Sequence, residues 1–214
     1  MNVVKSLASP LAMKARLSGL FLGTPANLNS YGRGINNLGQ VVGFSQVQDL
    51  GGFLYSNGQL TPLRLNVGNA INDLGQATGY ANTSADRYSS HAFLYTDGQM
   101  KDLGTLPGGS YSTGFGINSA GQVVGYSGSA GGSVHAFLHQ NGQMLDLNDL
   151  VDPATHFIDL SLAEGINDKG QMIANDGGHA YLLTPVPEPG TLALFEAALL
   201  GLGAWVRRYS NVLR

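Results

Sequence analysis

One short unit recurs four times along the chain, and this recurrence limits the fold more than any other feature. The copies read INNLGQVVGFS from Ile35, INDLGQATGYA from Ile71, INSAGQVVGYS from Ile117 and INDKGQMIAND from Ile166. The Ile-Asn pairs that open them are 36, 46 and 49 residues apart. A period of this length is typical of one supersecondary unit stacked on copies of itself. The chain is therefore predicted to fold as an array of similar units with connections of variable length.

Two kinds of turn punctuate each unit. In NNLG, NDLG, NSAG and NDKG an Asn opens the turn and a Gly closes it three residues later, which suits a type I turn followed by a left-handed residue. In three units a second turn follows, at Asn57-Gly58, Asp97-Gly98 and Asn141-Gly142. These pairs favour the two-residue type I′ loop, because both of its residues need positive φ. Each unit is thus predicted to contain two hairpins, or four short strands.

The predicted strands carry apolar residues on both faces. Phe93-Leu94 and Val123-Val124 are adjacent apolar pairs, and adjacent residues of a strand point to opposite faces. A sheet of this kind must be covered on both sides. Four-stranded sheets packed face to face are the blades of a β-propeller, so the predicted fold class is all-β and β-propeller-like, with about four four-stranded blades. The alternative is an open stack, or a partial ring completed by another copy.

The ends of the array differ from its middle. The fourth unit stops after HAYLLTP, from His179, and lacks a last strand, whereas LSGLFLGT at residues 17–24 resembles an isolated last strand. We expect this N-terminal strand to complete the fourth sheet and close the ring, because the pairing would hide exposed sheet edges. The 31 glycines and the low share of charged residues, 12%, fit short strands and tight turns better than helices.

Charge and composition argue against several kinds of function. The formal net charge is −3, with the acidic residues concentrated between residues 17 and 185, whereas nucleic-acid binding needs a basic footprint. The chain has no cysteine, which excludes disulfides, thiolate nucleophiles and Cys-ligated zinc. It contains no G-x-S-x-G, phosphate-loop or H-E-x-x-H motif. We therefore predict a protein without enzymatic activity and without a cofactor.

A histidine occupies the same place in three units, at His91, His135 and His179, where the first unit has Gly51. Histidine is a common metal ligand. Equivalent positions on the third strands of different blades lie far apart, however, and cannot converge on one ion. We expect these histidines to make structural hydrogen bonds and predict no metal site.

The variable loops are the predicted ligand surface. Both tight turns of every unit should fall on one rim of the array, and the longer connections, which alone vary between units, on the other. Variable loops on a rigid scaffold often carry recognition, and Tyr with Ser or Asn suits sugars through stacking and hydrogen bonding. Loops that vary without function are the alternative. The candidate ligand residues of this variable rim are Asp86, Arg87, Tyr88, Tyr111, Asp152 and His156.

After Pro185 the repeats give way to VPEPGTLALFEAALLGLGAWVRR. Residues 191–206 are nearly all apolar, and a helix of this length would reach about 24 Å, slightly short of a ~30 Å hydrocarbon core. Its apolar residues would lie all round the helix, which favours a membrane segment over a helix packed on the domain. We predict a transmembrane-type helix with a cytoplasmic basic pair. Its apolar residues include Leu192, Leu194, Leu199, Leu200 and Trp205.

This C-terminal segment resembles the PEP-CTERM sorting signal of Gram-negative bacteria over residues 186–208, with Pro-Glu-Pro, an apolar span and a basic end in that order. The repeats, with HAF at residues 91–93 and 135–137, resemble HAF-family extracellular repeats over about residues 17–185. The resemblance implies export, transient anchoring in the membrane and delivery to the cell surface or exopolysaccharide matrix. It also implies recognition by an exosortase at Pro187, Glu188 and Pro189, with Arg207 and Arg208 as the retention charge.

Three features depart from the resemblance. Glu196 interrupts the apolar span, YSNVLR extends past the basic pair, and residues 1–16 contain no clear signal peptide. The expected organisation is an N-terminal segment at residues 1–16, a repeat domain at 17–185 and a sorting signal at 186–214. The expected function is a structural or adhesive surface protein that binds exopolysaccharide. The alternatives are a secreted carbohydrate-active enzyme and a decayed copy that is not exported.

Overall fold

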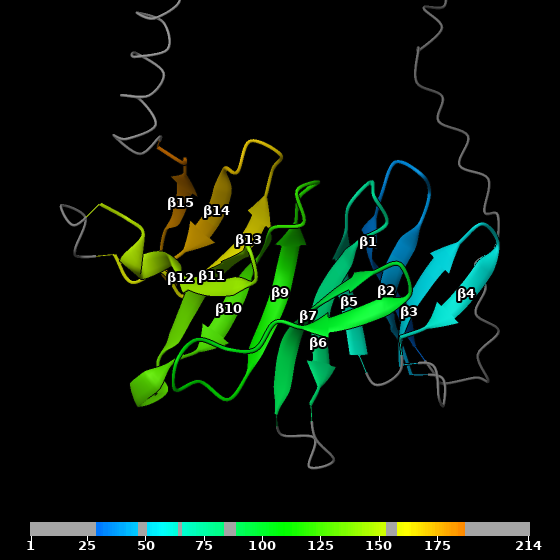
Figure 1. Cartoon of the computed structure of the whole chain (residues 1–214), viewed down its shortest axis with the longest axis horizontal. Helices are drawn as coiled ribbons and strands as arrows, with labels where there is room; N and C mark the ends of the chain where they lie inside the picture. Colours follow the sequence, from blue (N-terminus) through cyan, green and yellow to red (C-terminus); the bar gives the residue numbers. More distant parts are fainter. Residues whose placement is uncertain (1–28, 47–50, 64–65, 84–88, 153–157, 187–214) are drawn as a thin grey trace, which may run out of the picture.

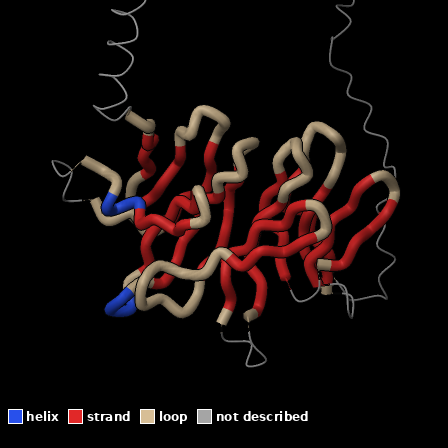
Figure 2. The backbone as a smooth tube through the Cα atoms, in the orientation of Figure 1, coloured by secondary structure: helices blue, strands red, loops and turns tan. Residues whose placement is uncertain are grey.

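A computed structural model of the chain describes residues 29–46, 51–63, 66–83, 89–152 and 158–186. These residues form an all-β structure of four antiparallel sheets that follow one another in chain order (Figure 1). The strands cross the structure from one edge to the opposite edge, and turns and loops at these two edges join successive strands (Figure 2). The all-β prediction is confirmed.

The first three sheets contain four strands each and the fourth contains three. The first sheet contains β1 (Ser30–Ile35), β2 (Val41–Ser45), β3 (Gly51–Ser56) and β4 (Gln59–Pro62). The second contains β5 (Asn66–Ile71), β6 (Ala77–Asn82), β7 (Ser90–Thr96) and β8 (Gln99–Asp102). The third contains β9 (Ser112–Ile117), β10 (Val123–Gly128), β11 (Val134–Gln140) and β12 (Gln143–Asp146). The fourth contains β13 (Leu162–Ile166), β14 (Met172–Asn175) and β15 (Ala180–Leu183). Two single-turn 3-10 helices, η1 (Ala130–Gly132) and η2 (Leu147–Asp149), lie in the third repeat.

The first three repeats fold as the two predicted hairpins, and turn chemistry sets the boundaries of the strands. Asn57, Asp97 and Asn141 have φ values near +50°. Each is followed by a glycine that also has positive φ, as a type I′ loop requires. The glycines that close the other turns, such as Gly39 and Gly75, have φ values of 73° and 76°. In both hairpins the sequence therefore supplies a residue that tolerates the left-handed region where the backbone needs it.

The core consists of three apolar clusters, one between each pair of consecutive sheets. The second sheet is covered on both faces, as the adjacent apolar pairs predict: Phe93 packs against the first sheet and Leu94 against the third. In each junction the first strand of one sheet contacts the first and second strands of the sheet before it. The buried members of the three clusters are Val42, Leu54, Leu63, Ile71, Ala77 and Phe93; Ala92, Leu103, Leu106, Ile117, Val123 and Phe137; and Val124, Ala136, Leu138, Leu147, Leu160, Ala163, Met172 and Ala174.

Glycines on the first strands let consecutive sheets approach closely. A Cβ atom added to Gly34 would lie 3.0 Å from the Cα atom of Ala70, and one added to Gly116 would lie 2.9 Å from the Cα atom of Gly165. Real Cβ atoms are almost never found as close as the contact at Gly116 and rarely as close as the contact at Gly34, so glycine at these positions permits the close approach. The equivalent first strands of successive repeats therefore lie next to one another.

The four sheets do not close into the expected ring. They stack face to face as an open row, with the first and fourth sheets at opposite ends (Figure 1). The same close junction is repeated three times, which extends the row, and at each end one face has no neighbouring sheet among the described residues. Within the described residues the fourth sheet has three strands, and the fourth repeat supplies no last strand there. Residues 17–24, expected to supply that strand, lie outside the described residues.

Among the described residues, no helix is long and apolar enough to cross a membrane. The predicted transmembrane-type helix, with Leu192, Leu194, Leu199, Leu200 and Trp205, lies outside that part of the chain. The same holds for the sorting residues Pro187, Glu188 and Pro189 and for Arg207 and Arg208.

Candidate functional site

The Asn that opens the first turn of each repeat organises that turn. In the second repeat, Asn72 Oδ1 accepts hydrogen bonds from the backbone N–H groups of Leu74 and Gln76, at 3.1 and 2.9 Å. Its Nδ2 group donates to Gln76 Oε1 at 2.7 Å. The same bonds recur around Asn36, Asn118 and Asn167. The repeated Asn and Gln residues are therefore used to build the turn.

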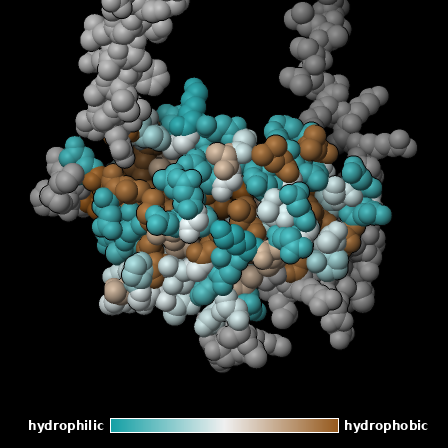
Figure 3. Space-filling view, in the orientation of Figure 1, coloured by the Kyte–Doolittle hydropathy of each residue, from teal (hydrophilic) through white to brown (hydrophobic). Residues whose placement is uncertain are grey.

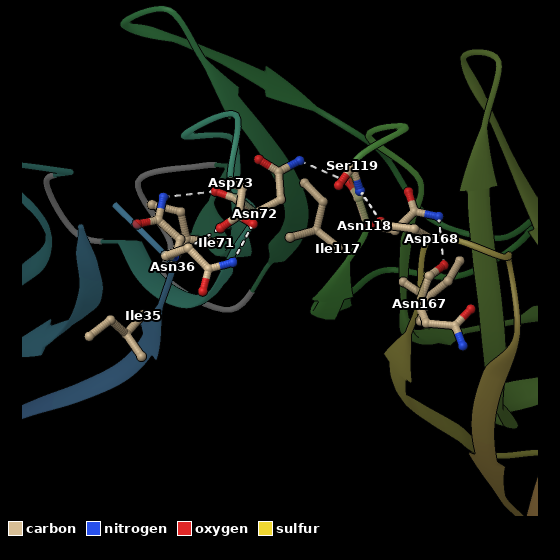
Figure 4. Close-up of a pocket in the computed structure, with 12 residues that line it drawn as sticks. Ile35, Asn36, Ile71, Asn72, Asp73, Ile117, Asn118, Ser119, Asn167 and Asp168 are labelled. Atoms are coloured by element: carbon tan, nitrogen blue, oxygen red, sulfur yellow. Dashed lines mark hydrogen bonds between the residues drawn. The ribbon is translucent and has the colours of Figure 1, made fainter. Parts of the chain in front are cut away.

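The Nδ2 group of this Asn also reaches the next repeat (Figure 4). Asn36 donates to the backbone oxygen of Asn72 at 2.9 Å, Asn72 to that of Asn118 at 2.8 Å, and Asn118 to that of Asn167 at 3.1 Å. We call this series of bonds the amide ladder. Asn36, Asn72 and Asn118 are buried, and the first two of these bonds lie in buried surroundings, where a polar group needs a partner within the protein. The amide ladder links all four repeats through one side-chain type.

The residue after the Asn adds a second connection between turns. Asp73 accepts from the backbone N–H and the side-chain Nδ2 of Asn37, at 2.8 and 2.6 Å. Asp168 accepts from the backbone N–H of Ser119 at 2.8 Å. The hydrogen bonds from Ser119 lower the pKa of the Asp168 carboxyl, because they stabilise its charged form. Asp168 is therefore ionised at neutral pH and is committed to a hydrogen bond with the preceding repeat.

These turns line one shallow depression of about 310 Å³, to which all four repeats contribute an Ile, an Asn and the residue after it (Figure 4). Its lining offers amide and carboxylate groups that could hydrogen-bond a polar ligand. Most of these groups already bond to a neighbouring turn, so the depression provides no free nucleophile paired with a base. The sequence prediction placed the ligand surface on the opposite rim and missed this depression. The sequence feature that could have revealed this depression is the Asn that follows the first Ile of every repeat.

Each of the three equivalent histidines pairs with its own aspartate. His91 Nδ1 lies 2.9 Å from Asp102 Oδ2, and His135 Nδ1 lies 2.6 Å from Asp146 Oδ2. Both aspartates end the last strand of their sheet. The expected structural hydrogen bonding is confirmed for these residues. No group of three or more metal-ligating side chains is found in the described part of the chain.

The pairing explains which repeats carry a histidine. In the second and third repeats the aspartate lies opposite Phe93 and Phe137. In the first repeat Pro62 takes the place of the aspartate, opposite Phe53, and Gly51 takes the place of the histidine. The fourth sheet has no last strand in the described part of the chain, and there His179 pairs with Asp176 of the adjacent turn at 3.3 Å. Asp176 also accepts from the Tyr181 hydroxyl at 2.6 Å, and this bond does most to lower the pKa of the Asp176 carboxyl. A histidine is therefore present in each repeat that places an aspartate within hydrogen-bonding distance of it.

The structure describes two residues of the predicted variable rim. Tyr111 is half-buried, and its ring meets that of Tyr126 edge to face, with ring centroids 6.2 Å apart. Phe115 extends the group, with its ring centroid 5.7 Å from that of Tyr126. The sequence prediction missed Phe115 and Tyr126, because strand aromatics look like ordinary core residues. Asp152 is exposed after η2, whereas Asp86, Arg87, Tyr88 and His156 lie outside the described residues.

A second cavity, of about 430 Å³, lies between the second and third sheets and is lined by Lys101, Gln122 and His139, among others. His139 is buried, and its Nδ1 atom has no hydrogen-bond partner in the described part of the chain. Burial lowers the pKa of the His139 imidazole, and the nearby charge of Lys101 lowers it further. The histidine is therefore held neutral inside the junction.

Comparison of the chain with models of known protein families, with curated proteins and with solved structures finds no match.

The lowered pKa of His139 predicts a pH dependence of stability. Below about pH 6.5, the ordinary pKa of histidine, the unfolded chain binds a proton at this residue that the folded chain does not. The free energy of unfolding should therefore fall as the pH drops from 7.5 to 5. Tyr55 and Tyr95 occupy the equivalent place in the first two repeats, so His139→Tyr should fold and should weaken the fall, as measured by urea titration across this range. An equally steep fall in His139→Tyr would contradict this assignment.

Proposed function

We propose that this protein is a non-catalytic surface or matrix protein, in which the stacked sheets act as the blades of a propeller-like scaffold. One observation carries the proposal: the polar side chains that recur in every repeat bond to their own turn or to the next repeat. Asn36, Asn72 and Asn118 make the amide ladder, and Asp73 and Asp168 accept from the preceding turn. Residues retained in every repeat thus serve assembly of the array.

The acids of the depression support a non-catalytic role. Glycoside hydrolysis usually needs two carboxyl groups about 5–10 Å apart, one of them with a raised pKa so that it can donate a proton. The pKa of Asp168 is lowered instead, and its carboxylate is held by Ser119. Asp73 is likewise held, by two groups of Asn37. These two acids are arranged as hydrogen-bond acceptors, which disfavours the alternative of a carbohydrate-active enzyme at this surface.

The proposed route to the surface rests on the C-terminal sequence. An exosortase would recognise Pro187, Glu188 and Pro189 while the following apolar segment, with Arg207 and Arg208 behind it, holds the chain in the membrane. Processing would then release the repeat domain to the envelope or the matrix. Glu196 adds a cost to membrane insertion, which stays small if this residue lies near the headgroups.

The proposed ligand is an exopolysaccharide, and the aromatic cluster of Tyr111, Phe115 and Tyr126 is the place that supports it best. The three rings are half-buried and in contact, which holds them in place while part of their surface faces solvent. Rigid aromatic rings beside hydroxyl and amide groups suit the apolar faces and the hydroxyls of sugars. The cluster lies by the variable rim. The Tyr111 ring packs closely against Gly128, where a Cβ atom would lie 3.1 Å from the ring.

Sorting can be tested by cell fractionation in a Gram-negative host that has an exosortase. A tagged chain supplied with a secretory signal peptide should reach the envelope or medium as a product that has lost its C-terminal segment. Replacing Pro187, Glu188 and Pro189 together by alanine should leave it unprocessed and membrane-bound, whereas a chain without residues 186–214 should be exported without processing. Identical sizes and locations for the wild type and the triple-alanine variant would contradict the proposed route.

Sugar binding can be tested with exopolysaccharide isolated from the host's biofilm matrix. The variant Tyr111→Ala/Tyr126→Ala should bind this polymer roughly 10-fold more weakly or worse, because aromatic anchors dominate recognition surfaces. Tyr80 is a matched control, since it lies opposite Ala92 in the second sheet as Tyr126 lies opposite Ala136 in the third. Tyr80→Ala should leave binding unchanged. Unaltered affinity in the double variant would remove the aromatic cluster as the ligand site.

A further inference from the structure

The open row ends in two different faces. The outward face of the fourth sheet, which we call the leading face, carries Ile173, Ala180 and Leu182. The outward face of the first sheet, which we call the trailing face, carries Ile35 and Val41. Figure 3 shows apolar atoms towards the end of the row that holds the fourth sheet. Both faces can be compared with the interior junctions, in which the same repeat positions meet.

The leading face exposes residues whose counterparts are buried or half-buried in every other repeat. Ile173 and Leu182, which lie opposite each other on β14 and β15, are 50% and 67% exposed. The counterparts of Ile173 are Val42, Thr78 and Val124, all fully buried against the following sheet. Gly165 shows the same difference, because an added Cβ would meet nothing within 4 Å, whereas one on Gly116 would strike the next sheet. The fourth sheet is therefore built like the others, but no sheet of the described part of the chain lies in front of it.

The trailing face shows the complementary difference. Ile35 is 71% exposed, whereas Ile71 and Ile117 at the same repeat position are buried against the preceding sheet. Its cross-strand partner Val41 is half-buried, whereas the counterparts Ala77 and Val123 are fully buried. In the first and third interior junctions, this pair on one sheet packs against the pair equivalent to Ile173 and Leu182 on the sheet before it. The two end faces are thus the two halves of one junction.

The amide ladder is open at the same two ends. Each interior Asn accepts at its backbone oxygen both the Nδ2 group of the previous repeat and the N–H of its own turn glycine. Within the described residues, the backbone oxygen of Asn36 accepts only from Gly39, and Nδ2 of Asn167 donates only to Gln171. Asn167 Nδ2 therefore has a donor to spare at the leading end, and the backbone oxygen of Asn36 can accept one more bond at the trailing end. A hydrogen bond between these two groups of different copies would continue the amide ladder.

Charges at the two ends also match. In the first two repeats the side chain two residues before the Ile reaches forward by one repeat: Arg33 Nη1 donates to Asn69 Oδ1 at 3.0 Å, and Asn69 donates to the backbone oxygen of Gly114 at 2.8 Å. The same place in the fourth repeat holds Glu164, which is exposed. If a second copy followed the fourth repeat, Glu164 would reach forward into the first repeat of that copy. The residue at the equivalent position there is Arg33. The junction between two copies would therefore pair opposite charges.

We propose that this protein associates with itself head to tail, with the trailing face of one copy packed on the leading face of another in the geometry of the interior junctions. The occupant of each end is a second copy, because the chain itself carries both halves of the contact. Such an interface is heterologous, so it gives a ring if the rotation closes and a filament if it does not. This assembly does not depend on the proposed route of export or on sugar binding.

The test uses two full-length variants, each with one damaged face. Ile35→Asp disrupts the trailing face and Leu182→Asp the leading face, and the exposure of both side chains should let the variants fold. The wild type should form dimers or larger assemblies in sedimentation velocity experiments. Each variant alone should associate roughly 30-fold more weakly or worse, because a charge then occupies the apolar centre of the contact. Mixed in equal amounts, the two variants should form a heterodimer through the one intact junction and grow no further.

Each other outcome would overturn the proposal. A wild type that stays monomeric at about 100 µM would show that the ends do not join copies, which includes the case in which residues 1–28 cover them. Loss of association in Leu182→Asp, with none in Ile35→Asp, would indicate a symmetric contact between two leading faces. Association unaffected by either variant would place the contact elsewhere, such as in the apolar C-terminal segment.

Charge reversal supplies a second readout that a purely structural role would not produce. Glu164→Arg and Arg33→Glu should each weaken assembly by a few-fold, and the weakening should fade at high salt, because exposed ion pairs are screened. The double variant Glu164→Arg/Arg33→Glu restores opposite charges across the junction and should recover assembly. Failure of the double variant to recover any of the loss would contradict the proposed pairing of Glu164 with Arg33.

Discussion

The hydrogen bond from one Asn side chain to the backbone of the next repeat is the constraint on which the rest of the structure depends. The same amide group orders its own turn and fixes the distance to the following turn, so Asn36, Asn72 and Asn118 couple local folding to stacking. The apolar clusters then fill the space between the faces that these bonds align. Because the bond is directional, one end of every array must be left with an unused donor and the other with an unused acceptor.

This polarity connects the fold to the proposed functions. A repeat that is complete only when another repeat covers it makes a scaffold that can be extended, and the exposed Ile35 and Leu182 mark where extension would occur. The recurring polar groups are occupied by assembly, which leaves recognition to features present in only one repeat. The aromatic cluster of Tyr111, Phe115 and Tyr126 is such a feature. A regular body with a local binding surface would suit the proposed role as a matrix or surface protein.

Much of the fold could be predicted from the sequence, because turns obey local rules. Asn57-Gly58 and its equivalents set the hairpins, and the missing strand of the fourth sheet is visible in the sequence after His179. Closure of the ring could not be predicted, since it depends on the rotation between sheets, which no short pattern records. The amide ladder was missed because turn chemistry alone already accounts for an Asn at that place. Phe115 and Tyr126 were missed because their proximity arises only when β9 pairs with β10.

The most direct test of the amide ladder compares the same substitution inside the row and at its leading end. Serine can still accept hydrogen bonds from the turn amides but cannot reach the next repeat. Asn118→Ser removes the bond to Asn167, whereas Asn167→Ser changes the same turn without breaking a bond to a following repeat. Chemical denaturation should show that Asn118→Ser loses about 1 kcal/mol more free energy of unfolding than Asn167→Ser, because it also removes the hydrogen bond to the following repeat. Equal losses in the two variants would contradict the central role of the amide ladder.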